Sequence, residues 1–150
     1  MILLRLDKES PNKCSLTPLR ERSELPIRWI HARLEVVHEV GEVTLLHPDG
    51  ELLGTADAVR PLLLVDCSWR DLPRVLRRVH GDLHPRRLPE GLRTAYPRRS
   101  KIFTDPAAGL ASVEALHAAQ CLLGRRDDSL LDGYRWREDW LSRNAGLLAP

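Results

Sequence analysis

The sequence predicts a single α/β domain in which a sheet, parallel at its centre, carries helices on both faces. Segments with a strand pattern alternate along the chain with segments that have the apolar period of a helix. Leu62–Asp66 is apolar up to its last residue, as expected of a strand buried on both faces of a parallel sheet. A chain of 150 residues, 43% of them hydrophobic, can bury one core but not two. We therefore treat residues 1–150 as one domain, with an N-terminal part (1–50) and a core part (51–150).

Two further strands are predicted in the N-terminal part. Ile2–Leu6 is a short apolar segment, and residues 43–46 form another that a turn at residues 47–50, His-Pro-Asp-Gly, should close. Residues 29–40 fit both a helix and a strand, so their structure is left open.

The helices are expected after the central strand. Ser68 is a candidate cap, with Asp71 three residues on, for a helix whose apolar stripe is Leu72, Val75, Leu76 and Val79. Residues 112–123 form a second helix ended by Gly124, and residues 128–144 form a third. The proline-rich segment 80–106, between the first and second of these helices, is typical of a loop, with short strands around Leu88 and residues 92–96.

Positive charge is concentrated in one segment. The formal net charge is only +2, but residues 70–101 carry ten basic side chains and three acids, a local charge of +7. Arginines gathered in this way suit contacts with nucleic-acid phosphates. Our candidate RNA contacts are Arg74, Arg77, Arg78, Arg98, Arg99 and Lys101. The alternative is a solvated surface with salt bridges to the acidic flanks.

The three cysteines indicate neither a disulfide framework nor a zinc site. Cys14, Cys67 and Cys121 are far apart, and no histidine lies at ligand spacing from them. Cys67 is a candidate nucleophile, but a small buried packing residue is the more frequent role. No apolar segment is long enough for a signal peptide or a membrane span, so we expect a cytoplasmic protein without a metal.

The segment Leu64-Val65-Asp66-Cys67-Ser68-Trp69 is the most informative in the chain. It is an apolar strand that ends in an acid, two small polar residues and a tryptophan. In open α/β sheets ligands bind at the carboxyl ends of strands, so a pocket is expected here.

Together with four other segments, this run resembles the aminocarboxypropyltransferases that modify a pseudouridine of small-subunit ribosomal RNA. The others are Pro11-Asn12-Lys13-Cys14-Ser15 with Leu19; Arg87-Leu88-Pro89; Leu110-Ala111-Ser112-Val113-Glu114-Ala115-Leu116; and a tail with Trp136, Trp140, Leu141 and Asn144. All five occur in the family's order and cover most of the chain. The segment Pro106-Ala107-Ala108-Gly109-Leu110 instead resembles the related DTW-domain enzymes, which modify a transfer RNA uridine.

The resemblance implies a SPOUT-like fold with a C-terminal trefoil knot, and S-adenosylmethionine as cofactor in the core part. It implies that Ser15 contacts the amino-acid end of the cofactor, that Asp66 holds the amino group and that Trp69 forms an apolar wall. Val65 and Leu88 would contact ribose and adenine through main-chain atoms, and Ser112 would lie near the adenine. Leu46-His47-Pro48 would complete the wall around the methyl group.

The residues alone leave simpler roles open. Ser15 and Ser112 also fit helix caps, Asp66 fits a partner for an arginine of the basic segment, and Leu88 and Trp69 fit core packing. We assign no catalytic base, because the six histidines are scattered and Glu114 suits a helix start better than proton transfer. A transfer RNA substrate, a methyltransferase and a non-catalytic factor in ribosome assembly remain as alternatives.

Overall fold

The computed structural model describes residues 1–6, 14–97 and 109–148. Its centre is a five-stranded sheet of order β2-β1-β4-β3-β5, in which every neighbouring pair is parallel. The strands are β1 (Ile2–Leu6), β2 (Arg28–Ala32), β3 (His38–Leu52), β4 (Leu62–Asp66) and β5 (Val79–Arg87). The predicted α/β class and the strands predicted for β1 and β4 are therefore confirmed.

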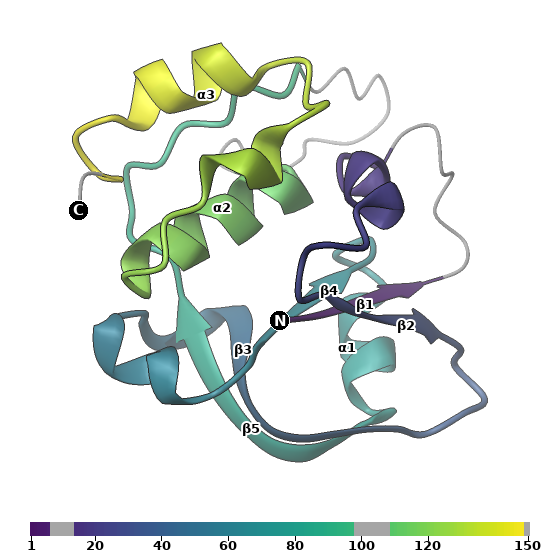
Figure 1. Cartoon of the computed structure of the whole chain (residues 1–150). Helices are drawn as coiled ribbons and strands as arrows, with labels where there is room; N and C mark the ends of the chain where they lie inside the picture. The colour runs from purple at the N-terminus through teal and green to yellow at the C-terminus, as the bar shows by residue number, and fades with distance from the viewer. Residues whose placement is uncertain (7–13, 98–108, 149–150) are drawn as a thin grey trace.

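Helices cover both faces of the sheet (Figure 1). On one face, α2 (Ser112–Leu122) and the 3-10 helices η2 (Thr17–Glu21) and η4 (Asp128–Leu131) share a core with the sheet, and α3 (Arg137–Asn144) lies over α2. On the other face, α1 (Leu72–Leu76) covers the sheet. A further 3-10 helix, η3 (Thr55–Val59), connects β3 to β4. Alternate residues of β1 serve the two cores: Leu3 packs in the cluster of Leu116, while Leu4 packs in the cluster of Val75.

Strand β3 departs from the prediction. The expected turn at residues 47–50 is wrong, because the strand continues to Leu52 through a register shift between Leu46 and Glu51 against β5. Gly50 explains this: a Cβ there would lie 2.4 Å from the main-chain nitrogen of Arg86, so only glycine permits this approach of the two strands. The open segment 29–40 contains the strand β2, a turn and the start of β3.

Strand β5 and the last two helices also differ from the prediction. Val79 was expected in a helix and residues 80–87 in a loop, but both belong to β5, and no strand follows at 88–96. Pairing along β3 explains this, since nearly every residue of β5 has a partner there. The helix predicted over residues 128–144 is broken into η4 and α3, with Gly133 at φ +79° between them. The helix predicted at 112–123 is confirmed as α2.

Among the described residues, no helix combines the length and the apolar character that crossing a membrane would require.

Candidate functional site

A pocket of about 940 Å³ lies at the carboxyl ends of β4 and β5, beside residues 46–48 of β3. Four parts of the chain line it: residues 46–48, 64–70 with Leu72, 87–92, and 109–112 with Ala115, joined by Cys14, Ser15 and Tyr96. Parallel strands end at the same edge of a sheet, which is why segments so distant in sequence meet here. All six residues predicted to bind a cofactor line this pocket: Ser15, Val65, Asp66, Trp69, Leu88 and Ser112.

Asp66 is the most firmly held polar group of the pocket. Its Oδ1 accepts a hydrogen bond from Ser112 Oγ at 2.6 Å, and its Oδ2 accepts one from Cys14 Sγ at 3.0 Å. The Nε atom of buried Arg5, opposite it on β1, lies 3.8 Å from Oδ2. The residue is only 9% exposed. An arginine partner from the basic segment was one alternative, but the arginine beside Asp66 is Arg5, which precedes that segment.

The two predicted serines join the pocket floor to the start of α2. Ser15 Oγ accepts a hydrogen bond from the main-chain N–H of Val113 at 3.1 Å, so this serine satisfies a free donor of the first helical turn from outside the helix. The cap position of α2 is Ala111, and Ser112 turns its hydroxyl to Asp66 instead. Of the two serines, only Ser15 therefore caps a helix.

Cys14 is a hydrogen-bond donor in this floor. Burial, and after it the neighbouring charge of Asp66, raise the pKa of its thiol to about 11. The thiol is therefore protonated at neutral pH, which fits its hydrogen bond to the carboxylate and excludes an activated thiolate at Cys14. Cys67 lines the pocket as a half-buried side chain.

Glu114 acts as a structural acceptor behind the pocket. Its side chain is fully buried and accepts hydrogen bonds from the main-chain N–H groups of Ala95 and Ala111 and from the hydroxyls of Thr94 and Tyr134, all between 2.7 and 2.9 Å. Four donors occupy both carboxylate oxygens, so Glu114 holds the surrounding chain segments together. This geometry suits a structural acceptor and not a catalytic base.

The C-terminal helix fixes the wall formed by residues 87–97. Asn144 Oδ1 accepts from the N–H of Arg93 at 2.7 Å, and its Nδ2 donates to the carbonyl of the same residue at 2.9 Å. Arg143 donates to the Thr94 carbonyl at 2.8 Å. Tyr96, which sequence analysis did not assign to the site, lines the pocket and meets the Trp136 ring edge-on, with centroids 5.0 Å apart. The tail residues thus position a pocket wall that has no regular secondary structure.

The rim of the pocket is exposed and basic. Trp69 is 49% exposed and lines the opening together with Arg70. Arg74, Arg77 and Arg78 are exposed on α1 and just after it, but none of them lines the pocket. Arg74 lies 3.4 Å from Asp71. The carbonyl of Arg78 accepts a hydrogen bond from the N–H of His38 at 2.7 Å, at the start of β3, so α1 runs from the pocket toward the opposite edge of the sheet. The other three candidate RNA contacts, Arg98, Arg99 and Lys101, lie outside the described residues.

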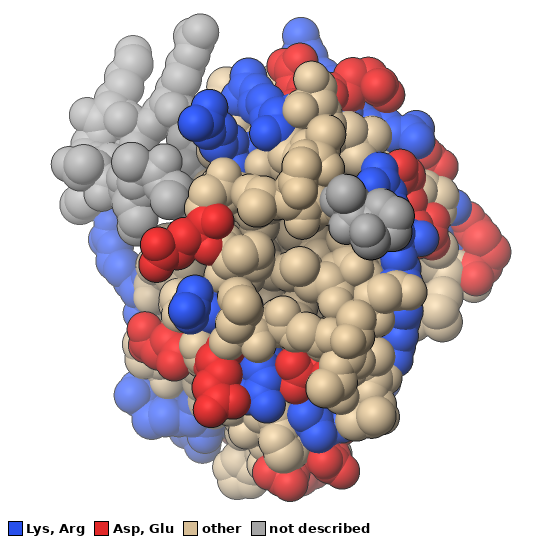
Figure 2. Space-filling view, turned by 90° about the vertical axis from the view of Figure 1, so that its left-hand side faces the viewer, with Lys and Arg blue, Asp and Glu red and all other residues tan. Residues whose placement is uncertain are grey.

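Part of the basic segment has a structural use. Arg86 Nε contacts the buried carboxylate of Asp57 at 2.8 Å, and Arg60 contacts the same oxygen at 3.1 Å. On the face shown in Figure 2, basic and acidic side chains gather together around an uncharged centre. The sequence count of +7 therefore overstates the charge that is free to meet a phosphate.

Among the described histidines, the best-defined contacts belong to His117, which does not line the pocket. Its Nδ1 accepts from Trp140 Nε1 at 3.1 Å, which places the proton on Nε2, 2.9 Å from Asp128 Oδ1. Burial lowers the pKa of His117, so the ring is neutral in the core. The His117 side chain is fully buried and packs in the core.

Comparisons with known proteins support the fold. No protein-family description matches the sequence, and no curated protein is similar to it. Among solved structures, the chain is similar to the SAM-dependent rRNA:acp-transferase Tsr3 from Vulcanisaeta distributa, with a TM-score of 0.74 and 24% sequence identity. The match covers 98% of this chain and 79% of that one. At this identity the similarity establishes a common fold.

Proposed function

We propose that this protein transfers the 3-amino-3-carboxypropyl group of S-adenosylmethionine to a uridine or pseudouridine of small-subunit ribosomal RNA. The observation that carries the proposal is the meeting of six predicted cofactor-binding residues in one pocket. They come from four separate parts of the sequence, around Ser15, Asp66, Leu88 and Ser112. The shared fold with a SAM-dependent rRNA:acp-transferase supports the same reading.

The pocket fits S-adenosylmethionine in size and in chemistry. Its volume of about 940 Å³ lies within the ~300–1,000 Å³ typical of small-molecule sites. Buried Asp66 offers an anion to the amino group of the methionine part, and the bonds from Ser112 and Cys14 hold that carboxylate in one orientation. Leu46, Pro48 and Trp69 provide apolar surface, and the indole face of Trp69 suits a sulfonium charge.

The residues of this chain determine which group is transferred by positioning alone. When bound, the sulfonium activates each of its three attached carbons toward displacement, so the carbon held in line with the RNA nucleophile decides the product. Apolar walls that enclose the methyl group, with Asp66 fixing the amino end, would select the aminocarboxypropyl carbon. Neither Cys14, whose thiol is protonated, nor Glu114, which accepts four hydrogen bonds, is suited to act as a base.

The remaining details of this proposal concern the RNA and the whole chain. Arg74, Arg77 and Arg78 would bind RNA phosphates along α1, away from the nucleotide that enters the pocket, and Arg98, Arg99 and Lys101 would bind others. We further propose that the chain is one domain, that its C-terminal segment forms the trefoil knot of the SPOUT class, and that it works in the cytoplasm during ribosome biogenesis.

The product released from the cofactor tests the chemistry. Purified protein should be incubated with S-adenosylmethionine and small-subunit RNA lacking the modification, and the small-molecule products separated by chromatography with mass detection. Methylthioadenosine together with an aminocarboxypropyl nucleoside is the expected result. S-adenosylhomocysteine would identify a methyltransferase instead. Cofactor binding without any product from ribosomal or transfer RNA would indicate a non-catalytic factor.

A further inference from the structure

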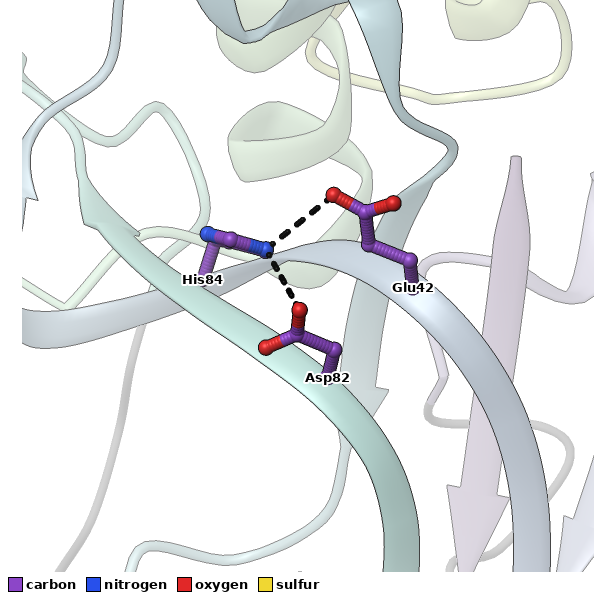
Figure 3. A group of neighbouring side chains, drawn as sticks. All are labelled: Glu42, Asp82 and His84. Carbon is purple, nitrogen blue, oxygen red and sulfur yellow. Dashed lines mark ion pairs between the residues drawn. The ribbon is translucent and has the colours of Figure 1, made fainter.

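Two acids and a histidine converge on the β3–β5 ladder outside the pocket. Glu42 on β3 is the register partner of Asp82 on β5, and His84 follows two residues later on the same strand. Residues two apart on a strand point to the same face, so all three side chains meet on one side of the sheet (Figure 3). None of the three lines the pocket.

The distances within this cluster match those between ligands of a small metal ion. His84 Nε2 lies 3.3 Å from Glu42 Oε1 and 3.4 Å from Asp82 Oδ2, and the three ligand atoms are all within 4.8 Å of one another. Ligand atoms bound tetrahedrally at about 2.0–2.1 Å from a zinc ion are about 3.3–3.4 Å apart. Two of the three distances between ligand atoms in this cluster therefore already match those of a zinc site.

The environment of His84 Nε2 is the second observation that points to an ion. This nitrogen is buried from water and forms no hydrogen bond within the described residues, although it faces two carboxylate oxygens. The carboxylates repel one another unless a cation lies between them. Arg60 Nη1 is 3.7 Å from Glu42 Oε1, but its guanidinium lies closer to buried Asp57, at 3.1 Å. Arg60 therefore neutralises this pair only in part.

We propose that Glu42, Asp82 and His84 bind a divalent transition-metal ion, for which Zn²⁺ is the best fit. One imidazole nitrogen and two carboxylate oxygens suit Zn²⁺, whereas Mg²⁺ and Ca²⁺ prefer sites made of oxygen alone. Water would take the fourth position, because the two acids are exposed. The ion would clamp β3 to β5 just before these strands reach the pocket at residues 46–48 and 87–88. This inference does not depend on the proposed transferase activity.

Metal titration of the full chain, prepared without a histidine tag and stripped with a chelator, tests this site. Co²⁺ should bind with one equivalent, give the visible absorption of a four-coordinate ion without a thiolate band, and be displaced by Zn²⁺. His84→Ala should lower the affinity for Zn²⁺ by more than the ~10–100-fold that loss of an outer-shell partner causes. Asp82→Asn and Glu42→Gln should each weaken binding without changing the shape of the site.

The matched control is His80→Ala. His80 lies on the same strand, 3.7 Å from Glu39, and does not belong to the cluster. The His80→Ala variant should bind Zn²⁺ with the affinity of the unmodified protein. Zn²⁺ should raise the melting temperature of the unmodified protein and of His80→Ala, but not that of His84→Ala. Equal affinity in His84→Ala, a thiolate absorption band from cysteine ligands, or no binding of Co²⁺ by the unmodified protein would overturn the proposal.

Discussion

The floor and the rim of the pocket are built in opposite ways. On the floor, Asp66 accepts hydrogen bonds from Ser112 and Cys14 and is 9% exposed, and Ser15 accepts one from the main-chain N–H of Val113. At the rim, Trp69 is 49% exposed and lines the opening together with Arg70 and Arg87.

This difference fits two kinds of ligand. A buried, fully bonded floor loses little entropy when it binds a small molecule in one orientation, because its side chains are already fixed. An exposed rim of long basic side chains and one aromatic ring suits a large polyanion that arrives from solution. Changes behind or in the floor should therefore affect stability and cofactor binding, whereas changes at the rim should affect RNA binding.

The largest effect is expected for Glu114→Ala, behind the floor. The substitution leaves the N–H groups of Ala95 and Ala111 and the Tyr134 hydroxyl without their buried acceptor. At about 1–3 kcal/mol for each unsatisfied group, we expect a loss of about 3–5 kcal/mol in the free energy of unfolding. Chemical denaturation measures it. The exposed Glu90→Ala is the control and should change stability by less than about 0.5 kcal/mol; similar values for both would contradict the structural role of Glu114.

Asp66→Asn should weaken cofactor binding. The amide keeps the shape of the side chain but removes the charge, and hydrogen bonds to charged groups contribute about 1.5–3 kcal/mol, or about 10–100-fold in affinity. Calorimetric titration with S-adenosylmethionine measures the change. Asp49→Asn, an isosteric change at an exposed acid beside the pocket residue Pro48, should bind normally. Unchanged affinity in Asp66→Asn would remove this residue from the proposed cofactor site.

Outside the pocket, on and just after α1, the triple substitution Arg74→Gln, Arg77→Gln and Arg78→Gln should weaken RNA binding without changing cofactor affinity. Each lost phosphate contact lowers the slope of log affinity against log salt concentration by about 1. Titrations of RNA at several salt concentrations give this slope. Arg28→Gln, on the edge strand β2, is the control. If the slope of the triple variant equals that of the control, these arginines lie outside the RNA interface.

The smallest effect is a pH dependence of stability from His117, which does not line the pocket. Burial lowers its pKa in the folded state, so below about pH 6.5 the unfolded chain takes up a proton that the folded chain does not, and stability falls as the pH decreases. His117→Gln should show a flatter dependence between pH 5 and 7 in thermal unfolding and should bind the cofactor normally. The hydrogen bond from Arg126 lowers the pKa of Asp128 to about 2, so this residue changes the stability with pH only below about pH 4. Equal slopes in both proteins would contradict this account.

Sequence analysis located those elements of the fold whose pattern is local. The apolar strands β1 and β4 and the helix α2 have clear periods, and all three were predicted. For β3, the strand predicted at residues 43–46 is confirmed, but its extension to His38 and Leu52 was not predicted, nor was β5. The polar residues of these segments form strands because the two segments pair with each other. The close approach at Gly50 and the break at Gly133 depend on contacts and dihedral angles that a pattern of residue types does not contain.

For the site, the sequence located the pocket but not its connections. The ordered motifs identified Ser15, Asp66 and Ser112, but nothing in their spacing shows that Ser112 donates a hydrogen bond to Asp66 or that Ser15 accepts one from Val113. The role of Asn144, which fixes the wall at Arg93, also required the structure. The cluster of Glu42, Asp82 and His84 was missed because its ligands are separated by about forty residues, so no short motif contains them.

The most direct test of the proposed transfer is mass spectrometry of nucleosides from ribosomal and transfer RNA of cells with and without this gene. Loss of an aminocarboxypropyl nucleoside from small-subunit ribosomal RNA alone, with recovery by the intact gene but not by an Asp66→Asn copy, is the predicted result. Loss from transfer RNA alone would contradict the substrate, and unchanged aminocarboxypropyl nucleosides in both RNA pools would contradict the transferase proposal itself.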